Sequence, residues 1–258
     1  MKSDKTSDAI NFIKKTQYFI ATKQDKQQAI HEFKRGLDYY NYRLKVINFI
    51  GYNHVLDAGC GFGQYSFILS QHNKKVSAID LNRNYIEIAR SISKLFNSEN
   101  ISFNQGDLHK INANPQKFDA IFCYGVLMYT KENEVLKEFS RILKPGGQLY
   151  ICSDGPGLPF YKIITLGIKK LELRPILSGI NLLIQSIWVN VFRKYILYPT
   201  FMTKNNILKL LKSNNFTVQY YGPDGSYGNL NNKYFTAHCG KTYFGLPHDY
   251  EIIATKNE

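Results

Sequence analysis

Residues 55–66 read Val-Leu-Asp-Ala-Gly-Cys-Gly-Phe-Gly-Gln-Tyr-Ser, an apolar pair that leads through an acid into three alternating glycines. Apolar residues continue from Tyr65 to Leu69 with the spacing of a helix. Glycines at such a turn let the backbone bend sharply and let a ligand approach it closely. The pattern predicts a β-strand, a tight turn and a helix, with a nucleotide-type ligand at the carboxyl end of the strand.

The spacing of the glycines distinguishes two classes of ligand. A dinucleotide fingerprint has the pattern Gly-x-Gly-x-x-Gly, whereas Gly59, Gly61 and Gly63 alternate with single residues and Gln64 takes the place of the third glycine. Asp57 stands two residues before Gly59, where its carboxylate would lie beside a pyrophosphate and repel it. The same carboxylate suits a ligand with an ammonium and a sulfonium, so these residues favour S-adenosylmethionine over NAD.

Residues 57–63 resemble the first motif of the class I S-adenosylmethionine-dependent methyltransferases. Asp80 ends the next apolar run, about twenty residues after Gly59, which is where nucleotide folds place a carboxylate against the ribose hydroxyls. Asp107 and Leu108 match the pair that contacts the adenine in this family. The turn Leu-Lys-Pro-Gly-Gly at 143–147, before a fifth predicted strand, is also frequent in the family.

The resemblance implies an α/β fold with a seven-stranded, mostly parallel, Rossmann-like sheet and helices on both faces. Residues 1–50 are predicted to form an N-terminal helical extension, which could close over the cofactor with Tyr39, Tyr40, Tyr42 and Arg43. The methyltransferase domain then covers 51–258, interrupted by a helical lid insertion at 154–200 and a loop insertion at 222–249. Both insertions begin where a parallel strand ends, so both should lie at the cofactor-binding edge of the sheet.

The resemblance also implies a set of cofactor-binding residues and a reaction. We expect S-adenosylmethionine to be bound by Asp57, Gly59, Cys60, Gly61, Gly63, Asp80, Leu81, Asp107, Leu108 and Cys123. The methyl group would pass in line to an acceptor, and no catalytic residue is assigned, because Tyr129 stands where many relatives have a histidine. The candidates for acceptor contact are Tyr124, Tyr129, Asp154 and His238. No metal site is expected, since the cysteines are far apart and no second pair supports His238-Cys239.

The net charge of +13 comes largely from scattered lysines, without a run of five basic residues. Residues 123–126 also lack the amino-methyltransferase signature of enzymes that act on DNA or RNA, which argues against a nucleic-acid partner. The favoured acceptor is a small, partly apolar metabolite. The alternatives are a methyltransferase that acts on nucleic acid or protein through its basic surface, and a non-enzymatic S-adenosylmethionine sensor. The methylated atom, the pathway and the oligomeric state stay open.

The sequence predicts a cytoplasmic protein with reduced cysteines, because the N-terminus lacks the apolar segment of a signal peptide. Residues 176–192 contain no charge for seventeen residues, but they include several polar side chains. We expect this stretch to be too short and too polar to cross a bilayer and to form part of the lid. Docking on an anionic membrane surface is the less favoured alternative.

Overall fold

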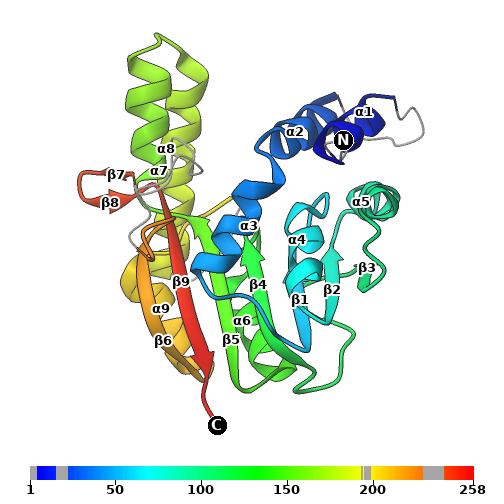
Figure 1. Ribbon diagram of the computed structural model, residues 1–258. Helices are drawn as coiled ribbons and strands as arrows, with labels where there is room; N and C mark the ends of the chain where they lie inside the picture. The colour runs from blue at the N-terminus through cyan, green and yellow to red at the C-terminus, as the bar shows by residue number, and fades with distance from the viewer. Residues whose placement is uncertain (1–4, 16–22, 193, 195–198, 229–240) are drawn as a thin grey trace.

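The computed structural model describes residues 5–15, 23–192, 194, 199–228 and 241–258. A seven-stranded sheet with the order β3-β2-β1-β4-β5-β9-β6 forms its centre (Figure 1). The neighbouring pairs from β3 to β5 are parallel, and β9 runs antiparallel to both β5 and β6. The strands are β1 (His54–Ala58), β2 (Lys75–Asp80), β3 (Ile101–Gln105), β4 (Phe118–Tyr124), β5 (Leu143–Asp154), β6 (Phe216–Pro223) and β9 (Asp249–Lys256).

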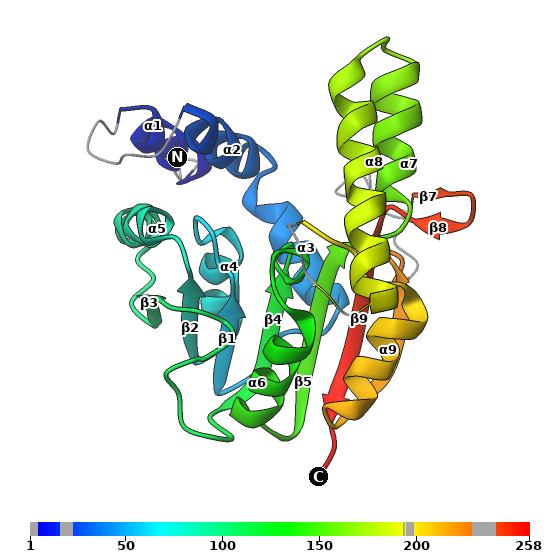
Figure 2. The same cartoon turned by 180° about the vertical axis from the view of Figure 1, so that it is seen from behind.

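Helices cover both faces of the sheet (Figures 1 and 2). The α-helices are α1 (Lys5–Lys15), α2 (Lys23–Lys34), α3 (Leu37–Val46), α4 (Gln64–His72), α5 (Arg83–Phe96), α6 (Glu132–Ile142), α7 (Leu158–Phe160), α8 (Leu173–Ile187) and α9 (Lys204–Ser213). Shorter 3₁₀ or π-helical pieces are η1 (Leu127–Tyr129), η2 (Tyr161–Ile168) and η3 (Trp188–Phe192). The predicted Rossmann-like fold with seven strands is confirmed.

The two faces of the sheet explain the near-continuous apolar runs of the central strands. On β1, Leu56 packs in a cluster with residues of α6 and α9, whereas Val55 packs with residues of α3 and α4. Successive side chains of a strand point to opposite faces, so a strand that is covered on both sides needs apolar residues at consecutive positions. Because these strands run parallel, the carboxyl ends of β1, β2, β4 and β5 lie at one edge of the sheet.

The bounds of two strands bear on the site. The third strand ends at Gln105, so Asp107 and Leu108 belong to the loop beyond it. The fifth strand begins at Leu143 rather than at Gln148, because Leu143 pairs with Phe118 before an irregularity in the register. Within this irregular stretch Gly146 has a φ of 72°, a left-handed backbone conformation that glycine adopts without strain.

The described parts of 154–200 and 222–249 follow β5 and β6 at the carboxyl edge of the sheet. The first forms a helical hairpin, with α7 and η2 on one side and α8 and η3 on the other, that projects from this edge (Figure 1). The described part of the second insertion contains the two-stranded hairpin of β7 (Thr242–Tyr243) and β8 (Leu246–Pro247). This small hairpin contacts the base of the helical one, where the N–H of Gly157 donates to the carbonyl of Pro247 at 2.8 Å.

Candidate active site

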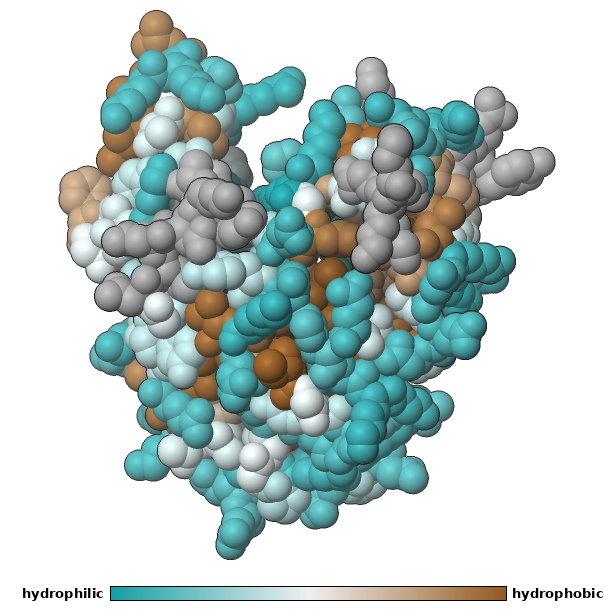
Figure 3. Space-filling model, in the orientation of Figure 1, coloured by the Kyte–Doolittle hydropathy of each residue, from teal (hydrophilic) through white to brown (hydrophobic). Residues whose placement is uncertain are grey.

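A cavity of about 650 Å³ lies at the carboxyl edge of the sheet. Its walls come from the ends of β1, β2, β4 and β5, from the loops beyond β1, β2, β3 and β4, and from α2 and α3. In the space-filling view, a notch separates the helical hairpin from the N-terminal helices at this edge (Figure 3). Open α/β sheets bind their ligands at this position, so the cavity is the candidate active site.

The glycine turn after β1 forms one wall of the cavity. Gly59, Gly61 and Gly63 have φ values of 80°, 52° and 87°. The N–H groups of Gly59 and Cys60 donate to the carbonyl oxygen of Ile79 on β2, at 2.7 and 3.0 Å. A Cβ atom on Gly59 would lie 2.2 Å from a methyl carbon of Val126. The turn therefore needs glycine at position 59 for both its backbone conformation and its packing.

Gly59→Ala is expected to destabilise the protein by about 2–4 kcal/mol, because it combines backbone strain at positive φ with overpacking against Val126. Gly146→Ala is the matched control, since Gly146 also has a positive φ of 72° but has open space around its Cβ position. The control is expected to cost about 1 kcal/mol. Urea unfolding of the two variants measures the difference, and equal losses would show that the contact with Val126 does not matter.

Asp57 is buried beside the glycine turn, and the hydroxyl of Ser66 donates to its Oδ2 atom at 2.6 Å. Burial raises the pKa of Asp57 to about 7, the hydrogen bond from Ser66 opposes this shift, and the neighbouring charge of Asp80 adds to it. A cation beside Asp57 would favour its ionised form. The site is thus suited to a positively charged ligand.

Asp80 lies at the end of β2 and already accepts two backbone hydrogen bonds. The N–H of Gly61 donates to Oδ2 at 2.9 Å, and the N–H of Asn82 donates to Oδ1 at 2.8 Å. Burial raises the pKa of Asp80, and these two N–H groups oppose the shift. Each carboxylate oxygen has a second lone pair, so both can still accept a hydrogen bond from a ribose hydroxyl.

Asp107 and His109 form the far wall of the cavity. Asp107 Oδ1 accepts hydrogen bonds from the backbone N–H of His109 at 2.9 Å and from its Nδ1 at 2.6 Å. Nε2 of His109 accepts a hydrogen bond from the N–H of Lys131 at 3.1 Å, which assigns the proton to Nδ1. The bond from the His109 N–H holds the pKa of Asp107 below its ordinary value. His109 thus fixes the loop after β3 to the start of α6.

Eight of the ten predicted cofactor-binding residues line this cavity: Asp57, Gly59, Cys60, Gly61, Asp80, Leu81, Asp107 and Leu108. Gly63 does not line it but begins α4, where a Cβ atom would lie 2.9 Å from the ring of Phe67. Cys123 does not line the cavity and its side chain is fully buried within the core, so its predicted part in cofactor binding stays a prediction. Tyr124 lines the cavity instead, because adjacent strand residues point to opposite faces.

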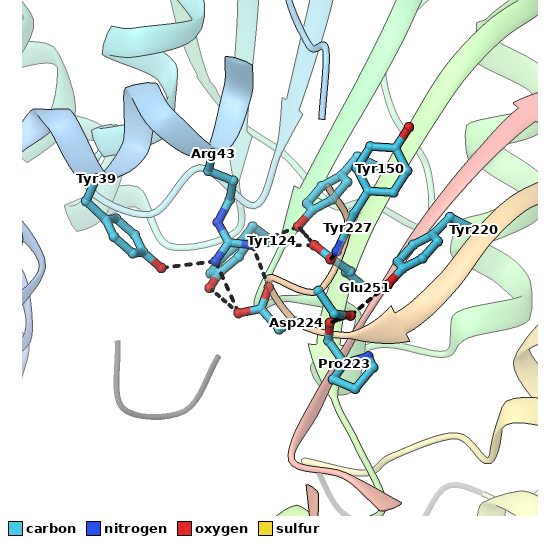
Figure 4. Close-up of polar contacts among 10 residues, drawn as sticks. Tyr39, Arg43, Tyr124, Tyr150, Tyr220, Pro223, Asp224, Tyr227 and Glu251 are labelled. Carbon is cyan, nitrogen blue, oxygen red and sulfur yellow. Dashed lines mark hydrogen bonds and ion pairs between the residues drawn. The ribbon is translucent and has the colours of Figure 1, made fainter. Parts of the chain in front are cut away.

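Three of the four predicted acceptor contacts also line the cavity, and His238 lies outside the described residues. The hydroxyl of Tyr124 donates to Asp224 Oδ2 at 3.3 Å (Figure 4). Tyr129 is 55% exposed at the rim. Asp154 ends β5, directly opposite Asp249 of β9.

Asp154 has the environment of a proton acceptor. Burial raises its pKa to about 7, the charge of Asp249 adds to the shift, and Lys162 and His248 oppose it. Nδ1 of His248 lies 3.0 Å from Asp249 Oδ1. Acidic and basic side chains therefore lie close together at this end of the cavity. A carboxylate poised near neutral pH can take a proton and release it again.

The helical hairpin does not cover the cavity as the sequence predicted for a lid. Among the described residues of 154–200, Asp154 is the one that lines it. The two sides of the hairpin pack on each other instead, with Gly179 close to the side chain of Ile163 and the carbonyl of Pro159. The cover comes from the N-terminal helices, which sequence reasoning only partly anticipated. They contribute Gln28, Glu32, Arg35 and Tyr40.

A buried polar network holds α3 against the sheet beside the cavity (Figure 4). Both terminal nitrogens of Arg43 contact the carboxylate of Asp224, with Nη1 to Oδ1 at 2.5 Å and Nη2 to Oδ2 at 3.2 Å. Arg43 also lies 3.7 Å from Glu251 and over the ring of Tyr124, 4.8 Å from its centroid. The expected closure by Arg43 over the ligand is wrong, because its guanidinium lies inside this network and Tyr124 separates it from the cavity.

Within the described residues, no group of three or more His, Cys, Asp or Glu side chains is arranged to hold a metal ion. The site consists of the glycine turn, Asp57 and Asp80 near the carboxyl ends of β1 and β2, Asp107 in the loop after β3, and Asp154 at the end of β5. The sheet has the strand order 3-2-1-4-5, followed by the antiparallel strand β9 and then by β6 at the edge. This order, with a ligand site of this kind at the carboxyl edge, is the architecture of class I methyltransferases.

The comparisons with known proteins agree with this architecture. Residues 52–165 match the family model described as a methyltransferase domain. The chain is 33% identical over 149 residues to a demethylmenaquinone methyltransferase from Lactococcus lactis, covering 55% of this chain and 59% of that protein. It is 28% identical over 117 residues to a ubiquinone biosynthesis O-methyltransferase from Coxiella burnetii, covering 45% and 50%. The chain thus aligns with little more than half the length of these curated relatives.

Among solved structures, an S-adenosylmethionine-dependent methyltransferase from Methanosarcina mazei superposes with a TM-score of 0.57. It shares 18% sequence identity, and the match covers 83% of this chain and 97% of that one. Residues 52–165 thus match a methyltransferase domain, and the fold of the chain is that of the class I S-adenosylmethionine-dependent methyltransferases.

Proposed function

We propose that this protein transfers the methyl group of S-adenosylmethionine in line to a small, partly apolar acceptor. The observation that carries the proposal is the arrangement of the cavity, with Asp57, Asp80 and Asp107 around the glycine turn and Asp154 at the end of β5. The first three suit a positively charged adenosyl ligand, and the last suits an acceptor that must lose a proton. The proposal places the enzyme in the cytoplasm, where its buried free thiols Cys60, Cys123 and Cys152 stay reduced.

The chain's own residues would bind the donor from three strand ends. Asp57 would hold the ammonium group near the sulfonium, and Asp80 would accept hydrogen bonds from the ribose hydroxyls with both oxygens. Asp107 would accept from the adenine amino group, while buried Leu108 packs against the ring. The sulfonium is already activated towards attack, so holding donor and acceptor in line is the main task. Such positioning can lower the barrier by roughly 7–11 kcal/mol.

The acceptor would lie between Tyr129 and the end of β5. Val126, Met128 and Cys152 supply apolar and soft surface to this part of the cavity, which suits a ring rather than a charged chain. The names of the two curated relatives concern demethylmenaquinone and ubiquinone biosynthesis, and this supports a hydroxylated aromatic or quinol-type ring. We further propose that Asp154 is the general base. S-adenosylmethionine would supply an activated methyl group, to which the acceptor's electron pair would bond as the bond to sulfur breaks. Asp154 would take the proton that the acceptor loses.

Binding of S-adenosylmethionine is expected to release a proton from Asp57. Because the pKa of Asp57 is about 7 in the free protein and a bound cation lowers it, affinity should fall as the pH drops below about 7. The dissociation constant should be about tenfold weaker at about pH 6 than at about pH 8. Calorimetry in two buffers with different ionisation enthalpies measures both the affinity and the protons released. Asp57→Asn should bind more weakly and lose the pH dependence; a variant that keeps it would contradict this role.

The same preparation tests the function as a whole. Labelled methyl transfer and formation of S-adenosylhomocysteine are followed with hydroxylated aromatic rings that carry an apolar substituent. Their unsubstituted parents serve as controls. Turnover that favours the apolar rings supports the proposal. Tighter binding of NAD than of S-adenosylmethionine would contradict the donor, and methylation of nucleic acid or protein alone would contradict the acceptor.

A further inference from the structure

The helical hairpin of α7–η2 and α8–η3 carries an apolar surface that is exposed to solvent. Leu171 at its tip is 94% exposed, Leu173 is 67% exposed and Leu177 is 52% exposed. The other large apolar side chains exposed on the hairpin are Ile168, Ile180, Ile184, Ile187, Trp188, Val191 and Phe192. Apolar residues gather on the hairpin in the space-filling view (Figure 3). A contiguous apolar surface of this kind marks an interaction site on a soluble fold.

The exposed residues form one stripe along α8 and η3. Successive members of the set Leu173, Leu177, Ile180, Ile184, Ile187 and Val191 are separated alternately by four and three positions, which places them on one side of a helix. Leu182 and Val189, on another side, are buried in the protein. The stripe therefore points away from the rest of the fold, and a helix of this length extends about 30 Å.

The charges on the hairpin identify the kind of partner. Lys169, Lys170 and Arg174 are exposed at the tip beside a single acid, Glu172, and residues 175–192 carry no charge. A water-exposed helix pair between two copies of the chain usually has charged residues beside its apolar seam. Here Arg174 is the one charged residue on the flank that continues through Asn181 and Trp188, so most of the seam has no charge beside it. The hairpin thus combines an uncharged apolar face, cations at its tip and the amphipathic ring of Trp188. These features suit the interface between the headgroups and acyl chains of an anionic bilayer.

The helical run of α8 and η3 is hydrogen-bonded to the rest of the fold. This bonding favours a helix that lies on a bilayer over one that crosses it. By length and composition alone, Leu173–Phe192 could cross a membrane. The uncharged stretch 176–192 is part of this longer helical run, so its length alone does not exclude a span, contrary to the expectation. However, Asn190 and Ser186 bond to the chain that follows: Nδ2 of Asn190 donates to the carbonyl of Phe201 at 2.8 Å, and the N–H of Phe201 donates to the hydroxyl of Ser186 at 2.9 Å.

We propose that the hairpin docks the protein on the surface of an anionic phospholipid bilayer. The stripe on α8 and η3 lies in the boundary between headgroups and acyl chains, and the cations at the tip contact the anionic headgroups. Since the hairpin leaves the sheet directly after Asp154, docking brings the carboxyl edge and its cavity near the bilayer. The inference stands on the hairpin alone and does not depend on the proposed reaction.

Co-sedimentation of the full chain with vesicles tests this docking. The protein is expected to bind vesicles of phosphatidylglycerol and phosphatidylcholine, and to bind phosphatidylcholine alone far more weakly. Leu177→Asp/Ile184→Asp should weaken binding at least about tenfold, because it places charge in the inserted stripe. Ile50→Asp/Leu95→Asp is the matched control, since both side chains are similarly exposed but lie off the hairpin. All four positions are exposed, and circular dichroism verifies that each variant is folded.

A second pair of variants tests the contribution of charge. Lys169→Glu/Lys170→Glu/Arg174→Glu should weaken binding to the anionic vesicles by about fivefold or more for each cation removed. Lys94→Glu/Lys137→Glu/Lys212→Glu makes the same change in net charge at exposed positions elsewhere and should have a smaller effect.

Three results would overturn the proposal. The first is that the unaltered chain does not bind, or that the hairpin variants bind as well as it does. The second is that the protein stays with the vesicles after an alkaline wash, as a spanning helix would. The third is a dimer in sedimentation velocity that Leu177→Asp/Ile184→Asp dissociates while vesicle binding is absent. Calorimetry with S-adenosylmethionine, run in parallel, shows whether donor binding is affected, so the two proposals can fail separately.

Discussion

Asp154→Asn is expected to lower kcat for methyl transfer by about 10²–10⁴-fold, which is the usual contribution of a general base. Asparagine keeps the shape of the side chain but cannot take the acceptor's proton. Affinity for S-adenosylmethionine should be unchanged, because Asp154 ends β5 whereas the donor-binding carboxylates follow β1, β2 and β3. Single-turnover kinetics with saturating donor separate the chemical step from binding.

The pH profile gives this prediction a readout that a structural role would not produce. The base must be ionised to act, and the pKa of Asp154 is about 7, so kcat of the unaltered enzyme should fall as the pH drops through about 7. Asp249→Asn is the informative control. It removes a charge that raises the pKa of Asp154, while Lys162 and His248 remain to lower it, so the acidic limb should move to lower pH with activity retained. If Asp154→Asn keeps both its rate and its acidic limb, another group is the base.

The part of the site that the sequence predicted is the part encoded locally. Asp57, Asp80 and Asp107 each stand at or just after the end of an apolar run, and the carboxyl ends of parallel strands meet at one edge. The order of the strands and the convergence of these three acids therefore follow from short segments. His109 was within reach of the same reasoning, since it stands two residues after Asp107, where its ring can return to the carboxylate.

The rest of the site depends on contacts between distant parts of the chain. Arg43 meets Asp224, 181 positions away, and nothing in the neighbourhood of either residue specifies the other. Arg35 and Gln28 line the cavity because α2 and α3 fold over the glycine turn. For the hairpin, the spacing of apolar residues gives a helix with an apolar face but does not say what that face covers. We therefore predicted that the apolar face of the lid covers the cavity, whereas in the structure this face is exposed to solvent.

The prediction with the largest effect on stability concerns the buried network of α3. Arg43→Met is expected to destabilise the fold by about 3–5 kcal/mol, because it leaves the carboxylates of Asp224 and Glu251 buried without their cation. Lys131→Met, which removes a partner from an exposed ion pair with Glu134, should cost no more than about 1 kcal/mol. Urea unfolding with circular dichroism measures both losses.

The loss in Arg43→Met should also depend on pH, in a direction set by Glu251. Burial raises the pKa of Glu251 above its ordinary value, the charge of Asp224 adds to the shift and Arg43 opposes it. A carboxyl group whose pKa is raised by folding stabilises the protein at low pH and loses that contribution as the pH rises through the folded value. Removing Arg43 raises this pKa further, so the loss of stability in Arg43→Met should be larger at about pH 8 than at about pH 5.

Arg43→Met/Asp224→Leu removes one of the two buried carboxylates that lose their cation, and it should recover part of the stability. A deficit that is independent of pH, or a double variant less stable than Arg43→Met, would show that packing of the arginine stem rather than its charge holds α3 on the sheet.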